Sequence, residues 1–150
     1  GIAAHSERFP HHRPLFEAFF HRWHETVGEP IAESVDMLRS LRQNGIRTFA
    51  LTNFSAETYP LAVARFPFLS EFDGTVVSGE EGVVKPDPAI YRAMHARIEP
   101  HLPGVAPHEL VFIDDNANNA AAATALGWHG IHHTSAAATE ARLRELGALT

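Results

Sequence analysis

The sequence has 150 residues, enough for one domain with a hydrophobic core, and its 45% apolar and 20% charged composition predicts a folded globule. A formal net charge of −6 argues against general binding to nucleic acid or to acidic membrane surfaces. No apolar run approaches the roughly 18 residues of a membrane span. Cysteine is absent, which excludes disulfides and thiolate metal sites and fits a cytoplasmic protein.

The first third of the chain is predicted to be helical and rich in aromatic side chains. Its first ten residues are polar and flanked by proline, which favours a poorly ordered start. Apolar residues then recur at helical spacing over 15–27, and a second helix is expected from residue 31 to Asn44. The aromatic residues of the first helix are Phe16, Phe19, Phe20 and Trp23. We expect this stripe to be core, since lining a substrate pocket is the less common role for such a pattern.

Strand and helix patterns alternate through the remainder of the chain. The predicted strands are 46–51, 75–78, 110–113 and 128–132, and the predicted helices are 55–65, a segment from Pro88 onward, 117–126 and 136–146. Alternation of this kind predicts an α/β fold with a parallel sheet and helices on both of its faces.

Three of these elements lead into polar residues that a parallel sheet would gather at one edge. One strand runs into Thr52-Asn53, another runs into Asp114-Asp115, and Lys85 lies in a proline-stiffened segment before a helix. A hydroxyl, an amide, an ammonium group and two carboxylates together suit a phosphate dianion with Mg²⁺, which prefers oxygen ligands. For the acid pair alone, the alternative is a helix N-cap followed by a first-turn acid.

Three segments resemble, in chain order, the second, third and fourth motifs of the haloacid dehalogenase-like (HAD) hydrolase superfamily: 50–55 (ALTNFS), 82–88 (GVVKPDP) and 112–116 (FIDDN). The segments 72–78 and 126–128 also resemble the branch of that family with a small helical cap. The resemblance implies a Rossmann-like core over 31–150 and a remnant of the cap over 1–30. It also implies Mg²⁺-dependent hydrolysis of small phosphorylated metabolites through an aspartyl-phosphate.

The resemblance assigns roles to six residues. Thr52, Asn53 and Lys85 would be the catalytic and phosphate-binding residues, Asp115 would bind Mg²⁺, Asp114 would assist, and Asn119 would support the outer shell of the metal. The paired acids favour the phosphatases over the 2-haloacid dehalogenases, which need no metal.

The first motif of the family, an apolar strand ending in Asp-x-Asp, has no match in the sequence. Its first Asp is the nucleophile and its second is the general acid/base. Asp73-Gly74-Thr75 is not a substitute, because the preceding residues 69–72 are too polar for a buried strand. We therefore expect a sheet without its central strand, open edges on the strands before Thr52 and Asp114, and a truncated, inactive phosphatase.

Other functions remain open at this point. A non-catalytic protein that binds phosphate or a partner would use the same residues without turnover, and a 2-haloacid dehalogenase would release halide without metal. A receiver domain also combines acids, Thr and Lys, but there the acids precede the other two in the chain. The sequence specifies neither the substrate nor an oligomeric state.

Overall fold

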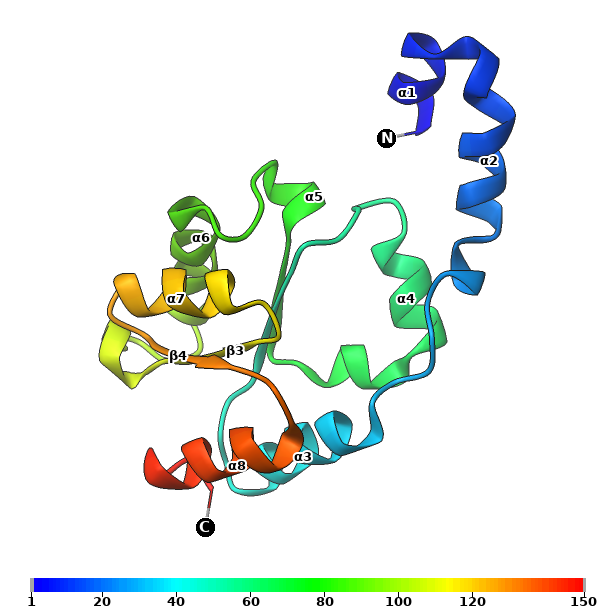
Figure 1. The fold of residues 1–150 in the computed structure, drawn as a ribbon. Coiled ribbons are helices and arrows are strands. Elements are labelled where there is room, and N and C mark those ends of the chain that lie inside the picture. The colour runs from blue at the N-terminus through cyan, green and yellow to red at the C-terminus, as the bar shows by residue number, and fades with distance from the viewer. Residues whose placement is uncertain (1, 150) are drawn as a thin grey trace.

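The computed structural model describes residues 2–149 as an α/β fold, as the sequence predicts (Figure 1). The helices are α1 (Ile2–Arg8), α2 (Arg13–His21), α3 (Ala32–Gln43), α4 (Tyr59–Arg65), α5 (Ser78–Glu81), α6 (Pro88–Ile98), α7 (Ala117–Ala125) and α8 (Ala136–Glu145). The strands are β1 (Phe49–Thr52), β2 (Gly74–Val77), β3 (Val111–Asp114) and β4 (His129–His132). Short 3-10 turns are η1 (Pro10–His12), η2 (Trp23–Glu25), η3 (Pro67–Glu71) and η4 (Pro107–Glu109).

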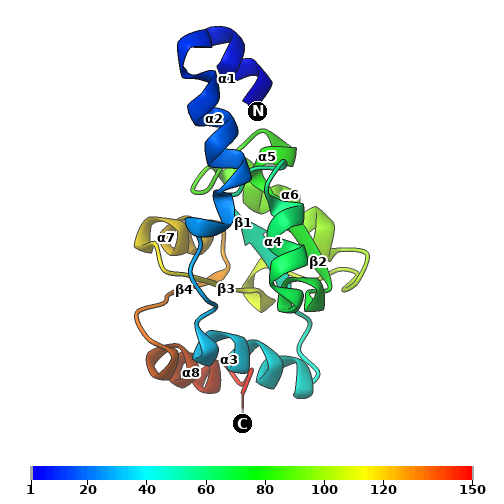
Figure 2. The same cartoon turned by 90° about the vertical axis from the view of Figure 1, so that its right-hand side faces the viewer.

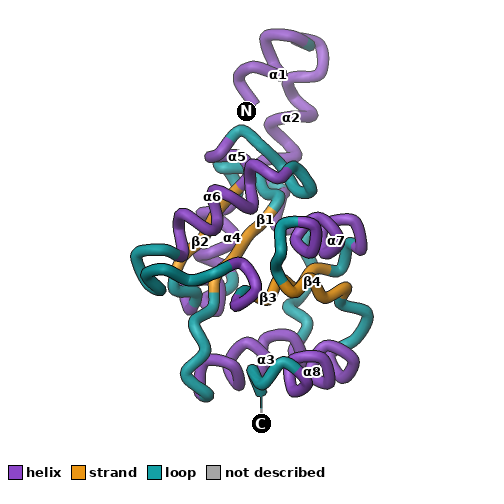
Figure 3. The backbone as a smooth tube through the Cα atoms, turned by 90° about the vertical axis from the view of Figure 1, so that its left-hand side faces the viewer, coloured by secondary structure: helices purple, strands orange, loops and turns teal. Residues whose placement is uncertain are grey.

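The four strands form two separate parallel pairs instead of one continuous sheet. In the first pair β1 lies beside β2, with Thr52 opposite Val77, and in the second β3 lies beside β4, with Asp114 opposite His132. Figure 3 shows the two pairs in orange. Within the described residues β1 and β3 each bond a partner on one side only, so each keeps an open edge, as expected for a sheet that lacks its central strand.

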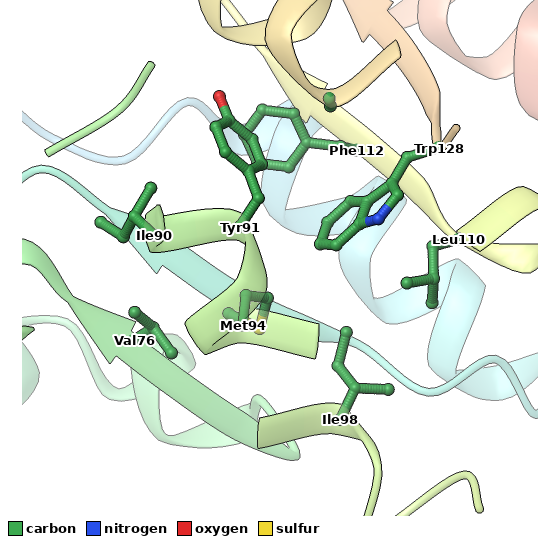
Figure 4. Close-up of a cluster of buried hydrophobic side chains, with 9 residues drawn as sticks. Val76, Ile90, Tyr91, Met94, Ile98, Leu110, Phe112 and Trp128 are labelled. Carbon is green, nitrogen blue, oxygen red and sulfur yellow. The ribbon is translucent and has the colours of Figure 1, made fainter. Parts of the chain in front are cut away.

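Helices cover both faces of the strand pairs and enclose two hydrophobic clusters. On one face α6 and α7 pack on the strands, around the fully buried Ile90 and Tyr91 (Figure 4). On the other face α3 lies against α8 and encloses Met37, Leu41 and Leu143 (Figure 2). The first cluster includes Val76 of β2 and Phe112 of β3, so it joins the two strand pairs through side chains where no backbone pairing does so.

Local sequence signals set the boundaries of several elements. Asp87 caps α6 by accepting a hydrogen bond from the N–H of Ala89, and Pro88 occupies the first turn, as predicted. Asn116, not the acid pair before it, caps α7 by accepting from the N–H of Asn118. The acids therefore precede the helix and remain at the end of β3.

The N-terminal expectations are only partly met. Residues 2–8 form the helix α1 where a poorly ordered start was expected. The aromatic stripe is also wrong as a core prediction, because Phe19 is 60% exposed and only Trp23 of its four members is buried. Figure 1 shows the reason: α1 and α2 stand apart from the strands and have little to pack against. No helix in residues 2–149 combines the length and apolar character needed to cross a bilayer.

Close packing of α7 on β4 depends on a single glycine. A Cβ atom on Gly130 would overlap the carbonyl oxygen of Ala120 and the hydroxyl oxygen of Thr124. The alanine-rich surface of α7 can therefore approach the strand at backbone distance. This contact holds the middle of α7 against β4, and α7 begins two residues after Asp115.

We predict that Gly130→Ala will lower the free energy of unfolding by about 1–3 kcal/mol, because α7 must move away from β4. Urea denaturation followed by circular dichroism measures this loss. Gly28→Ala is the matched control, since a Cβ at Gly28 meets nothing within 4 Å. Equal stability of the two variants would show that α7 does not pack as described.

Candidate functional site

The polar residues at the ends of β1 and β3 lie next to the loop that carries Lys85. Thr52 is the last residue of β1 and Asp114 is the last residue of β3, and both strands run parallel to their partners. The segment 82–87 connects α5 to α6 and contains Lys85, followed by a cis peptide bond to Pro86. The predicted gathering of these segments at one edge is thus present.

The ammonium group of Lys85 joins the two strand pairs. Its Nζ donates a hydrogen bond to the carbonyl oxygen of Leu51 in β1 at 2.8 Å and to Oδ2 of Asp114 in β3 at 2.7 Å. The same Nζ lies 5.5 Å from the ring centroid of Phe112, within the range of a cation–π contact. The side chains of Lys85 and Asp114 are only 10% and 6% exposed, so this is a largely desolvated ion pair.

Asn53 holds the backbone of Lys85 in place. The side-chain oxygen of Asn53 accepts from the N–H of Lys85 at 2.8 Å, and its amide nitrogen donates to the carbonyl oxygen of Lys85 at 3.1 Å. The Asn53 side chain thus pairs with both the N–H and the C=O of Lys85, as the backbone of a neighbouring β-strand would. The loop after β1 and the loop before α6 are therefore joined at this point.

Asp114 accepts hydrogen bonds from three directions. Oδ1 accepts from the N–H of Asn116 and from the side-chain amide of Asn119, both at 2.9 Å, while Oδ2 accepts from Lys85. Burial opposes ionisation, but these donors and the charge of Lys85 outweigh it and hold the pKa of Asp114 below its usual value. Tyr91 supports the arrangement by donating to the carbonyl oxygen of Asn119, and burial raises the pKa of Tyr91 to about 12.

Thr52 and Asp115 differ from the other four predicted site residues because their side chains form no hydrogen bond within the described chain. Both line one groove at the ends of β1 and β3, and the Asp115 side chain is exposed. A hydroxyl and a carboxylate without protein partners remain available to a ligand.

Among the predicted site residues, Asp115 alone offers Mg²⁺ a carboxylate without a protein donor. No group of three His, Asp or Glu side chains gathers anywhere in residues 2–149 in a way that could hold a metal. The carboxylate of Asp114 is fully engaged by donors, whereas that of Asp115 is open to solvent. Because Mg²⁺ commonly uses one or two carboxylates and completes its shell with water and phosphate, Asp115 fits a partial site.

Asp73 lies at the opposite end of the strands and is structural. It precedes β2, and it accepts from the N–H of Thr48 and from the guanidinium groups of Arg42 and Arg47. Burial opposes its ionisation, but these bonds and charges hold the pKa of Asp73 below its usual value. The prediction that this Asp is not a nucleophile agrees with its position.

Two hollows adjoin the polar residues, and sequence reasoning anticipated only the first. A groove of about 900 Å³ runs between the open edges of β1 and β3 and is lined by both strands over their full lengths. A smaller pocket of about 280 Å³ lies beside Asn53 and is lined largely by aromatic side chains from α2, η2 and the loop after β1. The aromatic stripe of α2 was the available signal for this pocket, although its pattern favoured a core.

The family model of the haloacid dehalogenase-like hydrolases matches residues 10–127. The match covers most of the chain, and the protein therefore belongs to the haloacid dehalogenase-like hydrolase family.

Similar proteins agree with this assignment. The chain is 32% identical over 124 residues to a sesquiterpene phosphatase of Aspergillus oryzae, covering 81% of this chain and 61% of that protein. It is 34% identical over 93 residues to a phosphoglycolate phosphatase of Nitrosospira multiformis, covering 61% of this chain and 38% of that protein. The structure of a predicted HAD-like hydrolase of Porphyromonas gingivalis superposes with a TM-score of 0.62 at 31% identity, covering 79% of this chain and 59% of the other. The chain thus spans about three fifths of the length of the first and third of these relatives.

We predict that Lys85→Met will lower the free energy of unfolding by about 3–5 kcal/mol, because it leaves the buried Asp114 carboxylate without its counter-charge. The double variant with Asp114→Asn should recover much of this loss. Urea denaturation measures both, and Arg13→Met provides the control by breaking an exposed pair with Glu17 at a cost below about 1 kcal/mol.

The same variant should change how stability depends on pH. Loss of Lys85 moves the pKa of Asp114 upward, because the ammonium group no longer favours the carboxylate. The stability that the ion pair gives the native chain at neutral pH is lost as the pH falls and Asp114 becomes protonated, so this advantage over the variant disappears in acid. The difference in the free energy of unfolding between the native chain and Lys85→Met should therefore become smaller as the pH falls. A difference that stays constant from neutral to acidic pH would contradict the ion pair.

Proposed function

We propose that this chain carries the phosphate- and metal-binding residues of a phosphatase that acts on small phosphorylated metabolites. The observation that carries the proposal is the bridge made by Lys85 between β1 and Asp114, with Asn53 bonded to the same lysine. Thr52 and Asp115 lie at the ends of the two strands that this bridge joins, and both line the groove with free polar groups, which supports the proposal. The phosphatase names among the relatives support the same reaction class.

In this proposal each residue has a distinct task. The hydroxyl of Thr52 and the amide of Asn53 donate to phosphate oxygens, and Lys85 supplies positive charge at the site. Asp115 would hold Mg²⁺, with Asn119 supporting the acid pair from behind through Asp114. When bound, the metal would neutralise part of the charge on the phosphate.

The nucleophile is proposed to come from an extended strand that lies in the groove between β1 and β3. The aspartates of the sequence are otherwise placed: Asp36 is exposed on α3, Asp73 is paired with arginines, Asp87 caps α6, Asp114 is bound to Lys85 and Asp115 is the proposed metal ligand. The open edges of two parallel strands supply unpaired N–H and C=O groups on both sides of the groove. A strand ending in a carboxylate there would bring it to the ends of β1 and β3.

A non-catalytic role in binding phosphate is the second candidate. The favouring observation is that Lys85 is already matched by Asp114, which leaves no described acid positioned as a nucleophile. Under this alternative the chain binds phosphate with Mg²⁺ and never turns over an ester. The two candidates share the binding residues and differ in turnover.

We predict that Asp115→Asn will weaken the binding of inorganic phosphate in the presence of Mg²⁺ by at least about tenfold, since the variant removes the free carboxylate. Isothermal titration calorimetry measures the affinity. Asp36→Asn makes the same change in charge on the exposed surface of α3 and should leave the affinity unchanged. Equal affinities in the two variants would remove Asp115 from the site.

We further predict that the 150-residue chain will not hydrolyse p-nitrophenyl phosphate with Mg²⁺, because its nucleophile is lacking. The same chain joined by a flexible linker to an apolar strand ending in Asp-x-Asp should gain turnover, and a strand ending in Asn-x-Asn should not. Thr52→Val in the active version should lower kcat/KM by about tenfold or more. Turnover by the 150-residue chain that disappears in Asp115→Asn would contradict the proposed origin of the nucleophile.

A further inference from the structure

The pocket beside Asn53, called here the aromatic pocket, has walls from two distant parts of the chain. Its volume is about 280 Å³, which is enough for a small organic group. The lining residues are Phe19, Phe20, Trp23, Asn53, Phe54, Ser55, Glu57 and Thr58.

The aromatic rings of this pocket form a wall that is not itself part of either hydrophobic cluster. Trp23 is buried and meets Phe54 edge to face at 5.7 Å between ring centroids, and Phe54 meets Tyr59 in the same way at 5.8 Å. Phe19 contributes a ring that is 60% exposed. Exposed aromatic surface gathered around a hollow is typical of a site for an apolar ligand.

The floor of the aromatic pocket is held rigidly. The N–H of Phe54 donates to the hydroxyl oxygen of Ser78 at 3.0 Å, and the N–H of Gly79 donates to the carbonyl oxygen of Phe54 at 3.0 Å. A Cβ on Gly79 would lie 2.8 Å from that carbonyl oxygen, so the loop approaches α5 as closely as a glycine permits. The side of the pocket formed by Phe54 is therefore pre-organised and loses little freedom when a ligand binds.

The aromatic pocket adjoins the proposed phosphate site at Asn53. Asn53 lines the pocket, and the same side chain is bonded to the backbone of Lys85. The organic group of a phosphate ester bound beside Asn53 would therefore lie within reach of the pocket.

The charges around the pocket decide between classes of organic group. Glu57 is the one charged side chain among the described lining residues, and no basic side chain lines the pocket. A second anionic group on the substrate, such as a carboxylate, would meet aromatic rings and no basic side chain among the described lining residues. An uncharged apolar group would meet only favourable surface.

We propose, on the basis of the proposed function, that the substrates are phosphate monoesters of uncharged, apolar alcohols, with the apolar group in the aromatic pocket. Phosphorylated carboxylic acids are disfavoured by the same site. Phe19 is a specificity-determining residue in this proposal, because its exposed ring lines the pocket and is not one of the proposed phosphate-binding residues.

The test compares ligands that share a phosphate and differ in the organic group. The 150-residue chain is titrated, with Mg²⁺ present, with inorganic phosphate, n-hexyl phosphate and phosphoglycolate, and the fluorescence of Trp23 reports occupancy. Hexyl phosphate should bind at least about tenfold more tightly than inorganic phosphate, because its alkyl group is removed from water, and phosphoglycolate should show no such gain. Trp23→Phe should abolish the signal, since the other tryptophan, Trp128, is buried in the hydrophobic cluster of α6 and α7.

Two variants on α2 separate the pocket from the general surface of the helix. Phe19→Ala should lower the affinity for hexyl phosphate by about fivefold and leave that for inorganic phosphate unchanged. Leu15→Ala removes a side chain that is 66% exposed on the same helix and is not among the lining residues, so it should change neither affinity.

The outcomes distinguish this inference from the proposed function. If hexyl phosphate and inorganic phosphate bind with equal affinity, and Asp115→Asn weakens both, the proposed role of the aromatic pocket is wrong and the proposed phosphate site is retained. Binding of hexyl phosphate that n-hexanol matches and Asp115→Asn does not change would overturn the proposed function, and with it the assignment of the pocket to a phosphate ester.

Discussion

The ion pair between Lys85 and Asp114 is the interaction on which the arrangement of the site depends. It spans two strand pairs that share no backbone hydrogen bonds within the described residues, and it is almost fully removed from water. A buried pair of this kind adds little net stability, because desolvation offsets much of the attraction, but losing one member is costly. Its physical effect is positional: the ends of β1 and β3 are held at a fixed separation. Thr52 is the last residue of β1 and Asp115 follows the last residue of β3, so the ion pair also limits the distance between these two residues.

The groove between β1 and β3 would be unstable in an ordinary sheet, because two open edges face one another. Here buried side chains on one face of the strands hold the two pairs together in place of backbone hydrogen bonds. The helix α6 buries Ile90 and Met94 in a cluster that includes residues of β2 and β3, so both strand pairs are fastened to one helix. The pairs can therefore remain in register without a strand between them, and the groove stays open along the length of both edges.

Local signals in the sequence predicted the core of this architecture well. The apolar run before Asp114, the Asp87-Pro88 helix start and the alternation of strands and helices all appear in the structure, since each depends on a few neighbouring residues. Contacts between distant residues were not predictable. Lys85 and Asp114 are 29 residues apart, and the sequence suggested a lysine facing phosphate instead of one already matched by a carboxylate. The exposure of Phe19 was equally hidden, because helical periodicity identifies an apolar surface but not what covers it.

The six residues indicated by the motifs thus divide into two physical classes. Asn53, Lys85, Asp114 and Asn119 use their polar atoms on one another, and a ligand could recruit them only by competing with existing bonds. Thr52 and Asp115 have no such partners in the described chain, so a ligand can engage them at no cost in lost protein contacts. Pattern matching treats the six alike, because motifs record residue types and order. The division arises from geometry. Side chains that bond one another build a rigid edge, and the side chains at that edge without protein partners are the ones that a ligand can engage without breaking protein contacts.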